Sequence, residues 1–480
     1  MNSRIYLVSL LHGVFSEIYC YQIALLNPME KVVKAFIGRS LIRFNWHSQM
    51  AVIFTWALLN TTLGLSWVCS SLLIKPLGDR LGRNFCCCIL QPILTIISSV
   101  LMAVSLPLNS IELLIFGHFL SGAACALTSF VTVFIYECAN TSNRAFCLSI
   151  SLIGTPIWEC LGAAAGLPQL LGSEKYWVCI FSFPALFALI YLLCGVFYLH
   201  ESPEFLYSVK HVPEKARQSL LFYQGCSADF EQFEREMQAQ QQLQGGGSVT
   251  INQIFKRKIF FWPVLLSLAV GSATNSGGGA YVMVCYGCEI LRLGFQLPAH
   301  KAALYSGITL LSASGIGALS ALALTSVQIS RRSHFFCSIL AADIGLLVLF
   351  SCWQIGNSAS VMAVLSMFVI SAAYSAGLVV MSPCVVSEIS PLAVRALSSS
   401  VRVVSHGLGG CWQSLAFSPL RELLGAWALL ICNVADPFCL LFLWLYLPET
   451  MGKSVDQVCE RWQQQEAVET LPLLHQQAEF

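Results

Sequence analysis

The stretch Gly78-Asp79-Arg80-Leu81-Gly82-Arg83 separates two long apolar segments of the chain. Its glycines permit close approach of the backbone to neighbouring elements, and its charged side chains can engage helix ends and opposite charges. A short charged loop between two segments long enough to cross a bilayer is typical of a helical membrane protein. We expect Asp79, Arg80 and Arg83 to hold the adjoining helix ends together.

Twelve apolar segments near the length of roughly 20 residues that crosses a bilayer follow one another along the chain. They lie at residues 5–26, 49–73, 86–106, 112–136, 146–168, 177–199, 259–287, 303–325, 335–353, 360–386, 396–418 and 423–447. The sequence therefore predicts an all-α membrane protein with twelve transmembrane helices in two six-helix bundles. The predicted divisions are an N-terminal bundle at 1–200, a cytosolic linker at 201–258, a C-terminal bundle at 259–450 and a cytosolic tail at 451–480.

The composition agrees with this interpretation. Hydrophobic residues make up 56% of the chain and charged residues 11%, against roughly a quarter charged in soluble proteins. A net charge of +1 gives no reason to expect a nucleic-acid partner. The first apolar segment lacks a small-residue cleavage site, so we expect it to be a retained span with a cytosolic N-terminus. Eighteen of the 26 Lys and Arg residues then fall on the cytosolic side.

Charged residues recur at equivalent places in the two halves. Glu137 and Arg144 follow the fourth segment, and Glu388 and Arg395, also seven apart, follow the tenth. Such repeats suggest a duplicated fold whose cytosolic salt bridges close one face and break when it opens; the alternative is independently solvated loop charges. An acidic residue near a proline also follows the last apolar segment of each half: Glu201 precedes Pro203, and Glu449 follows Pro448. The expected gating residues are Asp79, Arg80, Arg83, Glu137, Arg144, Glu201, Glu388, Arg395 and Glu449.

Together with these repeats, five short motifs resemble the sugar-porter family of the major facilitator superfamily, which includes the facilitative glucose transporters. The resemblance runs from about Tyr19 to Val458. It implies the major facilitator fold, and alternating access of a small-molecule solute to a central polar site between the halves. The motifs are Cys20-Tyr21-Gln22, Asn27-Pro28, Gly117-His118, Glu201-Ser202-Pro203 and Pro448-Glu449-Thr450-Met451-Gly452.

The positions that this family uses for sugar differ here. The family's amide in span five falls on Leu152, its tryptophan in span ten on Pro383, and its asparagine in span eleven on His406. Gly277-Gly278-Gly279 should loosen the seventh span, either as part of a cavity wall or as a packing face for a neighbouring helix. The expected substrate-binding residues are Gln22, Asn275, Ser276, Tyr281 and His406.

Gln22 and His118 occupy the positions where proton-coupled members of the family carry an acid and an arginine. Because a glutamine cannot take up a proton, the resemblance favours passive uniport of a hexose or hexose-like solute. The alternatives are a proton relay through Glu17 and nearby histidines, an organic ion carrier using Arg402 or His406, or a transport-dead nutrient receptor or scaffold. No nucleophile with a base, phosphate-binding loop or metal cluster is evident, so we expect a non-enzymatic protein without a cofactor.

The 21 cysteines lack paired CxxC spacing, so we expect packing roles and no metal site. The run Cys86-Cys87-Cys88 is consistent with packing or with palmitoylation. In the tail, Glu469 with Leu473 and Leu474 fits an acidic dileucine signal that sorting adaptors bind. We expect residence in the plasma membrane, with endosomal or lysosomal membranes as the alternative.

Overall fold

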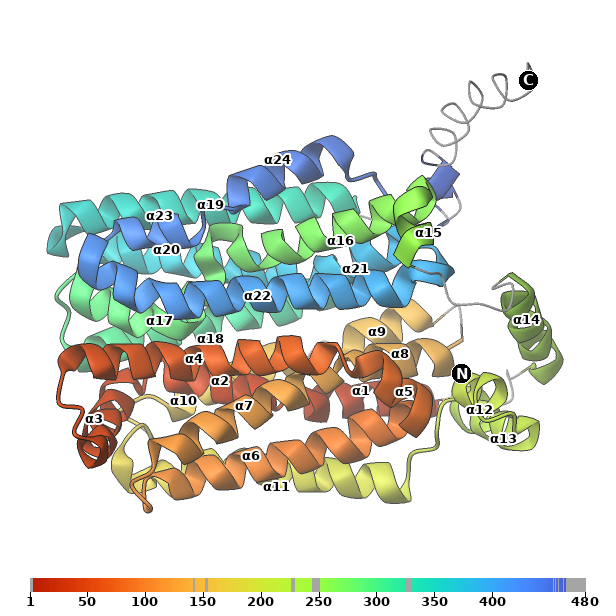
Figure 1. The fold of residues 1–480 in the computed structure, drawn as a ribbon, viewed down its shortest axis with the longest axis horizontal. Coiled ribbons are helices and arrows are strands. Elements are labelled where there is room, and N and C mark those ends of the chain that lie inside the picture. The colour runs from red at the N-terminus through yellow and green to blue at the C-terminus, as the bar shows by residue number, and fades with distance from the viewer. Residues whose placement is uncertain are drawn as a thin grey trace.

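A computed structural model gives the fold of the chain (Figure 1). It describes residues 3–140, 143–151, 154–225, 229–243, 251–323, 330–451, 453, 455, 457–460 and 462. Within these residues the regular structure is entirely helical, and most of the long helices run nearly side by side along the longest axis of the molecule.

The first half of the chain forms one bundle. Its first apolar segment is two helices, because the backbone turns at Glu17 and Ile18. The fourth segment is divided in the same way between α7 and α8, and a π-helical turn at Phe85–Leu90 precedes α6. The helices of this bundle are α1 (Ser3–Ser16), α2 (Tyr19–Leu26), α3 (Glu30–Leu41), α4 (Gln49–Ser71), α5 (Ile74–Leu81), α6 (Gln91–Ser105), α7 (Ile111–Leu127), α8 (Ser129–Cys138), α9 (Arg144–Ser151), α10 (Gly154–Ala165) and α11 (Trp177–Phe197).

The second half forms the other bundle. Its seventh apolar segment is divided by a 3-10 turn at Gly277–Gly279, and its tenth by a π-helical turn at Tyr374–Leu378. The helices of this bundle are α16 (Lys258–Ser276), α17 (Ala280–Glu289), α18 (Ala299–Ala323), α19 (Arg331–Ile355), α20 (Ser360–Ala373), α21 (Val379–Ile389), α22 (Leu392–Leu424), α23 (Trp427–Cys432) and α24 (Asp436–Tyr446).

All twelve apolar segments are therefore helical where the structure describes them. Eight helical runs in the described residues are long and apolar enough to cross a membrane. The other four segments correspond to α1 with α2, α9 with α10, α18, and α22. These segments contain a break, undescribed residues or polar side chains, which lowers their length or hydropathy without changing their place in the bundles.

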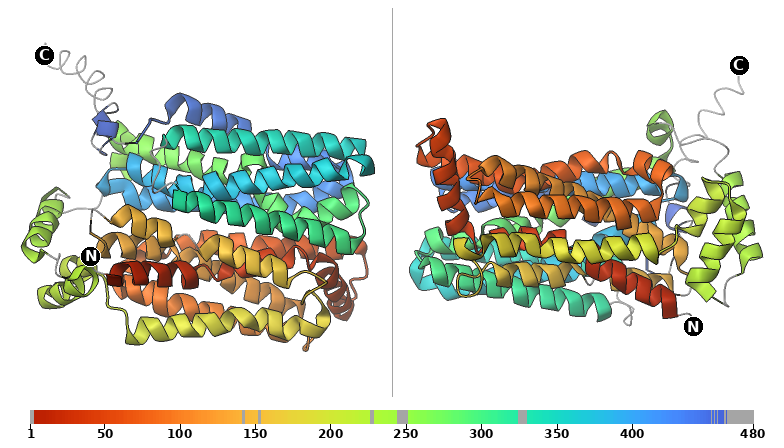
Figure 2. Two further views of the ribbon diagram at one scale, coloured as in Figure 1. Left: turned by 180° about the vertical axis from the view of Figure 1, so that it is seen from behind. Right: turned by 90° about the horizontal axis from the view of Figure 1, so that it is seen from below.

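The polar region between the halves contains four short helices at one end of the molecule. The helices α12 (Pro203–Ser208), α13 (Pro213–Gln224), α14 (Phe230–Leu243) and α15 (Ile251–Lys256) lie at the same end as the N-terminus in both views (Figures 1 and 2). Following the orientation expected from the positive-inside rule, we call this end the cytosolic end and the opposite end the extracellular end. Helix α3 lies across the opposite, extracellular end.

The bundles meet along two helix pairs. Helix α4 packs along α22, and α10 packs along α18. A hydrogen bond of 3.1 Å joins Thr61 on α4 to Ser414 on α22. On the same face, a Cβ at Gly64 would lie 3.1 Å from Cys411 Sγ, so this glycine allows close helix approach.

Candidate solute path and its gates

A buried network of charges joins the two bundles at the extracellular end. Lys34 Nζ lies 2.8 Å from both Glu30 and Glu289, Arg292 lies 2.8 Å from Glu30, and Arg421 lies 3.0 Å from Glu289. The Glu30 side chain is 1% exposed and the Glu289 side chain 0%. We call these five residues the extracellular ion network. Its carboxylates are almost fully withdrawn from water, so they depend on these cations for compensation.

Glu30 begins α3, outside the membrane-spanning segments. Burial raises the pKa of the Glu30 carboxyl, but Lys34 and Arg292 outweigh burial and bring this pKa below its ordinary value. The carboxylate is therefore ionised throughout the neutral range.

Asn27 adds a second connection between the bundles beside this network. Its Nδ2 donates hydrogen bonds to the carbonyl of Met283 at 3.2 Å and to Ser306 Oγ at 3.0 Å. Its Oδ1 accepts a hydrogen bond of 2.8 Å from the N–H of Cys288. All polar groups of this buried amide are thus used across the interface, and the extracellular end is closed.

At the cytosolic end, the first bundle is closed by an arginine from its charged loop. Arg83 Nε lies 3.1 Å from Glu137, and its Nη1 donates to the carbonyl of Gly78 at 3.1 Å. Ser202 Oγ donates to the other oxygen of Glu137. Glu201 accepts a hydrogen bond of 2.9 Å from the N–H of Arg83. Helix α8, the loop after α5 and the start of the linker are therefore held together; we call this the N-latch.

The second bundle contains the same arrangement. Arg331 Nε lies 3.6 Å from Glu388, and Thr450 Oγ1 donates to Glu388 at 2.5 Å. Glu449 accepts from the N–H of Arg331 at 3.2 Å and from Ser330 Oγ. We call this the C-latch. Its members Arg331, Glu388, Glu449 and Thr450 correspond to Arg83, Glu137, Glu201 and Ser202 of the N-latch.

The two carboxylates that bind backbone N–H groups titrate differently. Burial raises the pKa of Glu201, and its backbone hydrogen bonds only partly offset this. At Glu449 burial acts in the same direction, but Ser330 and three backbone N–H groups outweigh it and lower the pKa. The difference follows from the greater burial of Glu201.

The ion pairs differ from those expected between residues seven apart. Glu388 pairs with Arg331, whereas Arg395 donates to the carbonyl of Ser390 at 3.3 Å and to Tyr136 Oη, in the other bundle, at 3.4 Å. The helix ends between Glu388 and Arg395, so the two residues lie on separate helices and do not share a face. Glu137 likewise uses Arg83; the side chain of Arg144 lies outside the described residues. Asp79 and Arg80 are exposed.

Gln22 lies inside the first bundle. It donates to Ser99 Oγ and accepts from Ser98 Oγ, both at 3.2 Å. His118 Nδ1 lies 2.9 Å from the carbonyl of Leu59 and 3.4 Å from Thr62 Oγ1. The glutamine and the histidine thus bind neighbours in their own bundle.

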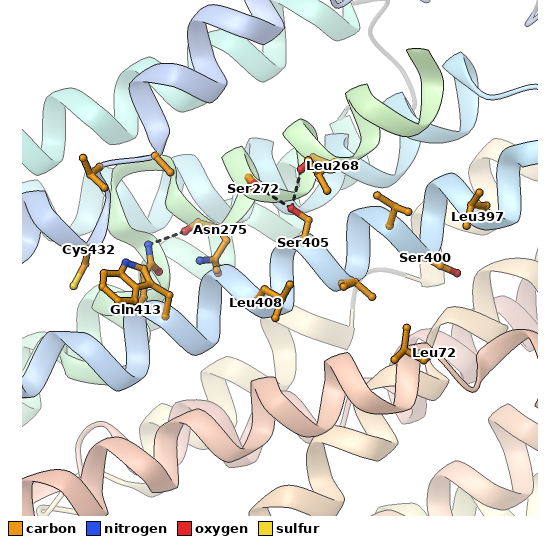
Figure 3. A pocket seen from close by; sticks show the side chains of 16 residues that line it. Leu72, Leu268, Ser272, Asn275, Leu397, Ser400, Ser405, Leu408, Gln413 and Cys432 are labelled. Atoms are coloured by element: carbon orange, nitrogen blue, oxygen red, sulfur yellow. Dashed lines mark hydrogen bonds between the residues drawn. The ribbon is translucent and has the colours of Figure 1, made fainter. Parts of the chain in front are cut away.

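A pocket of about 590 Å³ is formed mainly by α16, α22 and the end of α23, with Leu72, which follows α4, at its edge (Figure 3). Asn275 contributes a side-chain amide that is 1% exposed, and neither of its polar atoms has a hydrogen-bond partner among the described residues. Nearby, Ser405 Oγ lies 2.7 Å from Ser272 Oγ. Gln413 Nε2 donates to the carbonyl of Asn275 at 3.4 Å. An apolar pocket with an unpartnered amide can accept a solute that brings its own hydrogen-bonding groups.

Tyr281 and His406 do not line this pocket. Tyr281 approaches α22 at Gly410, one helical turn from His406, and the His406 ring lies 5.0 Å from the Trp67 ring of α4. The side chain of Ser276 lies outside the described residues, as does Leu152. Of the five predicted binding residues, only Asn275 lines the pocket within the part of the chain that the structure describes.

The glycine turn explains why α16 and α17 are separate helices. Gly278 has φ +61°, a left-handed conformation that favours glycine. Its N–H donates to Asp343 Oδ1 at 3.0 Å, and a Cβ at this position would lie 2.5 Å from Ala342. The helix is therefore broken at Gly277–Gly279, and the break packs closely against α19. For Gly278, close packing on a neighbouring helix explains the glycine better than a cavity wall does.

Comparison with known proteins agrees with this fold. Residues 10–462 match the family described as "Sugar (and other) transporter". The chain is 22% identical to the facilitated glucose transporter member 1 of Gallus gallus, over 92% of this chain and 90% of the relative. It is 24% identical to a facilitated glucose transporter homolog of Caenorhabditis elegans, over 85% and 79% respectively.

Solved structures show the same architecture. The inward-open xylose transporter XylE from E. coli superposes with a TM-score of 0.75 at 17% identity, covering 95% of this chain and all of that one. The same proton:xylose symporter bound to 6-bromo-6-deoxy-D-glucose also gives 0.75, at 18% identity, covering 96% and 99%. The structure is therefore a major facilitator fold in a multi-pass integral membrane protein. The chain belongs to the sugar transporter family of the major facilitator superfamily.

Proposed function

We propose that this transporter is a facilitative carrier that moves a hexose or hexose-like solute by alternating access. The observation that carries this proposal is the contrast between the two ends: an ion network joins the bundles at one end, whereas the latches at the other end lie within each bundle. Exposing a central site to either side in turn requires closures that can break separately. A static receptor or scaffold gains nothing from such closures, which argues against that alternative.

Passive transport is supported by the way Gln22 is bound. The side-chain amide of Gln22 is hydrogen-bonded to the hydroxyls of Ser98 and Ser99. Neither an amide nor a serine hydroxyl titrates between pH 5 and 8. A proton relay through Glu17 and the histidines has less support, because the hydrogen bonds of Glu17 among the described residues go to Thr155 and Cys20 and reach no histidine. Movement of the solute down its own gradient needs no titrating group.

An organic anion is the second candidate solute, and one observation favours it. Arg402 donates to Ser382 at 3.3 Å, but its buried Nε has no hydrogen-bond partner among the described residues. A buried guanidinium with a free donor is suited to an anionic group. The two candidates differ in whether transport needs Arg402.

We place the transporter in the plasma membrane, with endosomal or lysosomal membranes as the alternative. The proposed adaptor signal at Glu469, Leu473 and Leu474 lies outside the described residues. Its test is the distribution of a tagged chain in cells before and after replacement of both leucines by alanine.

The test of the solute class is uptake by liposomes that contain the purified chain. Labelled hexoses, polyols and organic anions are compared at external pH 5.5 and 7.5, with the Arg402→Gln variant in parallel. Saturable hexose or polyol uptake at both pH values, retained by Arg402→Gln, supports the uniport proposal. Uptake restricted to anions and lost in Arg402→Gln supports the second candidate. No uptake at all, from folded protein, contradicts both.

A matched control separates loss of charge from loss of a solute contact. Arg39→Gln removes a cation whose partner, Glu174, is exposed at the extracellular surface. This variant should transport at the wild-type rate for either class of solute, because an exposed ion pair contributes little.

A further inference from the structure

Four side chains with metal-binding groups meet inside the first bundle. His12 Nδ1 lies 2.7 Å from Tyr191 Oη and 4.0 Å from Cys88 Sγ. Cys88 Sγ lies 3.4 Å from Cys87 Sγ and 3.5 Å from Tyr191 Oη. The ligand atoms of His12, Cys87 and Cys88 all lie within 4.8 Å of one another. They come from α1, the π-helical turn at Phe85–Leu90 and α11.

The cluster is enclosed by apolar side chains. His12, Cys87 and Cys88 are each 0% exposed, and Tyr191 is 1% exposed. The ring of Phe134 packs edge-on against the His12 imidazole with centroids 5.0 Å apart. Both thiols are inaccessible, so packing, the first of the two interpretations of Cys86-Cys87-Cys88, describes them better than palmitoylation.

The hydrogen bonds fix the tautomer of the imidazole. Cys88 can donate to Tyr191 Oη, and Tyr191 can donate to His12 Nδ1. The Nδ1 atom then carries no hydrogen, which is the form that binds a metal. The Nε2 atom is buried and has no partner among the described residues. The ring is therefore fixed by Phe134 and Tyr191, and its Nδ1 acceptor lies 2.7 Å from Tyr191 Oη and 4.0 Å from Cys88 Sγ.

We propose that this cluster binds one Zn²⁺ ion through Cys87 Sγ, Cys88 Sγ and His12 Nδ1, with Tyr191 Oη in the fourth position. Tetrahedral zinc with Zn–S near 2.3 Å and Zn–N near 2.0 Å places its ligands about 3.5 to 3.8 Å apart. The separations of 3.4 Å between the two sulfurs, 4.0 Å from Cys88 to His12 and 3.5 Å from Cys88 to Tyr191 differ from this by up to about half an ångström. His12 Nδ1 and Tyr191 Oη, 2.7 Å apart, must separate by about 0.8 Å, and Cys87, within 4.8 Å of His12, must approach it. Small side-chain rotations complete the geometry.

Charge balance selects the metal. Binding forms two Zn–S bonds and releases the two thiol protons to water, with no change in oxidation state. Zn²⁺ with two thiolates, a neutral imidazole and a neutral phenol has no net charge, and a neutral complex is the form that a buried apolar site tolerates. Cu⁺ in the same site would leave one negative charge. Thiolate sulfur and imidazole together suit zinc better than Mg²⁺ or Ca²⁺, which prefer oxygen.

The site lies in the half of the first bundle nearer the cytosolic end. His12 is nine residues from the start of α1, about 14 Å along the helix at 1.5 Å per residue. Because its ligands come from the segments that form the first, third and sixth spans, the ion would tie these three spans together on the side of the molecule that carries the N-latch.

The experiment uses the full chain, reduced, stripped with a chelator and reconstituted in detergent. Zn²⁺ is added, and bound metal is measured by mass spectrometry after gel filtration; Co²⁺ is added separately, because thiolate-ligated tetrahedral Co²⁺ has intense visible bands. We expect one Zn²⁺ per chain, thiolate–Co²⁺ bands, and a higher Tm with Zn²⁺. Cys88→Ser and His12→Gln should each lower Zn²⁺ affinity at least tenfold. Cys86→Ser is the matched control, since Cys86 is equally buried and adjacent but outside the cluster.

Tyr191→Phe, which keeps the ring in place, provides a milder variant in case the others do not fold. It should keep the thiolate–Co²⁺ bands while lowering affinity. Absence of bound Zn²⁺ in the reduced wild-type chain overturns the proposal. Equal loss of Zn²⁺ in Cys86→Ser and Cys88→Ser also overturns it, as does metal that remains bound when His12 and Cys88 are both replaced.

Discussion

Lys34 and Glu289 form an ion pair of 2.8 Å that joins the two bundles at their extracellular end. Glu289 is shared, because its other oxygen binds Arg421 at 3.0 Å and Ser418 at 3.0 Å within its own bundle. Opening toward the outside therefore requires Lys34 to leave a carboxylate that is withdrawn from water.

Glu289→Gln should weaken the closure of the extracellular end. A buried ion pair that loses one partner costs about 3 to 5 kcal/mol, which is at least a hundredfold in an equilibrium. Hydrogen exchange of the peptide that covers residues 283–294 should rise in this variant, since the closed state protects it.

The control for this variant is Glu112→Gln. Glu112 pairs with Arg43 at 2.9 Å at the same end, but both side chains are about half exposed, and such pairs contribute about 0 to 1 kcal/mol. Equal exchange in the two variants would show that the buried network does not hold the closed state.

The extracellular closure should not depend on pH between 5.5 and 7.5. Glu30 has a pKa below its ordinary value of about 4.3, so its contribution to stability is complete above that value and is lost only as pH falls through the lower pKa of the folded state. Exchange of residues 283–294, corrected for the intrinsic pH effect, should stay constant over this range. A decrease in protection already at pH 5.5 would mean that a different group titrates.

A double-mutant cycle should show coupling between Arg331 and Glu388, but not between Arg395 and Glu388. The first two residues lie 3.6 Å apart, and contacting residues couple by about 0.5 to 3 kcal/mol. The expected coupling for Arg331→Gln with Glu388→Gln is about 1 kcal/mol, measured from unfolding in detergent. A larger coupling energy for Arg395→Gln with Glu388→Gln would restore the pairing of residues seven apart.

Gly278→Ala should destabilise the protein more than Gly277→Ala. A left-handed conformation costs an L-residue about 1 to 2 kcal/mol, and the added methyl group would lie 2.5 Å from the backbone of Ala342. At Gly277 φ is −52° and the nearest atom belongs to the flexible side chain of Leu378. The measurement is the Tm of both variants; similar values would mean that α19 can move aside.

The bundles could be predicted from the sequence because a bilayer imposes one length and one polarity on every spanning segment. The same pattern identified the linker, since a polar stretch such as Met237 to Gln244 cannot cross hydrocarbon. The breaks within spans were less visible: Gly277–Gly279 indicated one of them, but the turn at Glu17 and Ile18 has no glycine or proline.

The sequence indicated which charged residues would lie at the cytosolic face, but not which of them would pair. Arg83 and Glu137 were both expected to act at the cytosolic face, but their pairing depends on how two loops meet in space. The extracellular ion network was not predicted, because the positive-inside rule assigns Lys34, Arg292 and Arg421 to the outside without pairing them. Glu30 and Glu289, acids beside those cations in the same loops, were the available signal. No pattern in the sequence indicated that His12 would lie beside Cys87 and Cys88.

The two cytosolic latches are built alike but are unequal in burial. The side chains of Arg83 and Glu137 are 16% and 5% exposed, whereas those of Arg331 and Glu388 are 28% and 33% exposed and lie farther apart. Water competes more effectively for the second pair. We therefore expect the duplicated architecture to act in sequence, with the C-latch breaking before the N-latch.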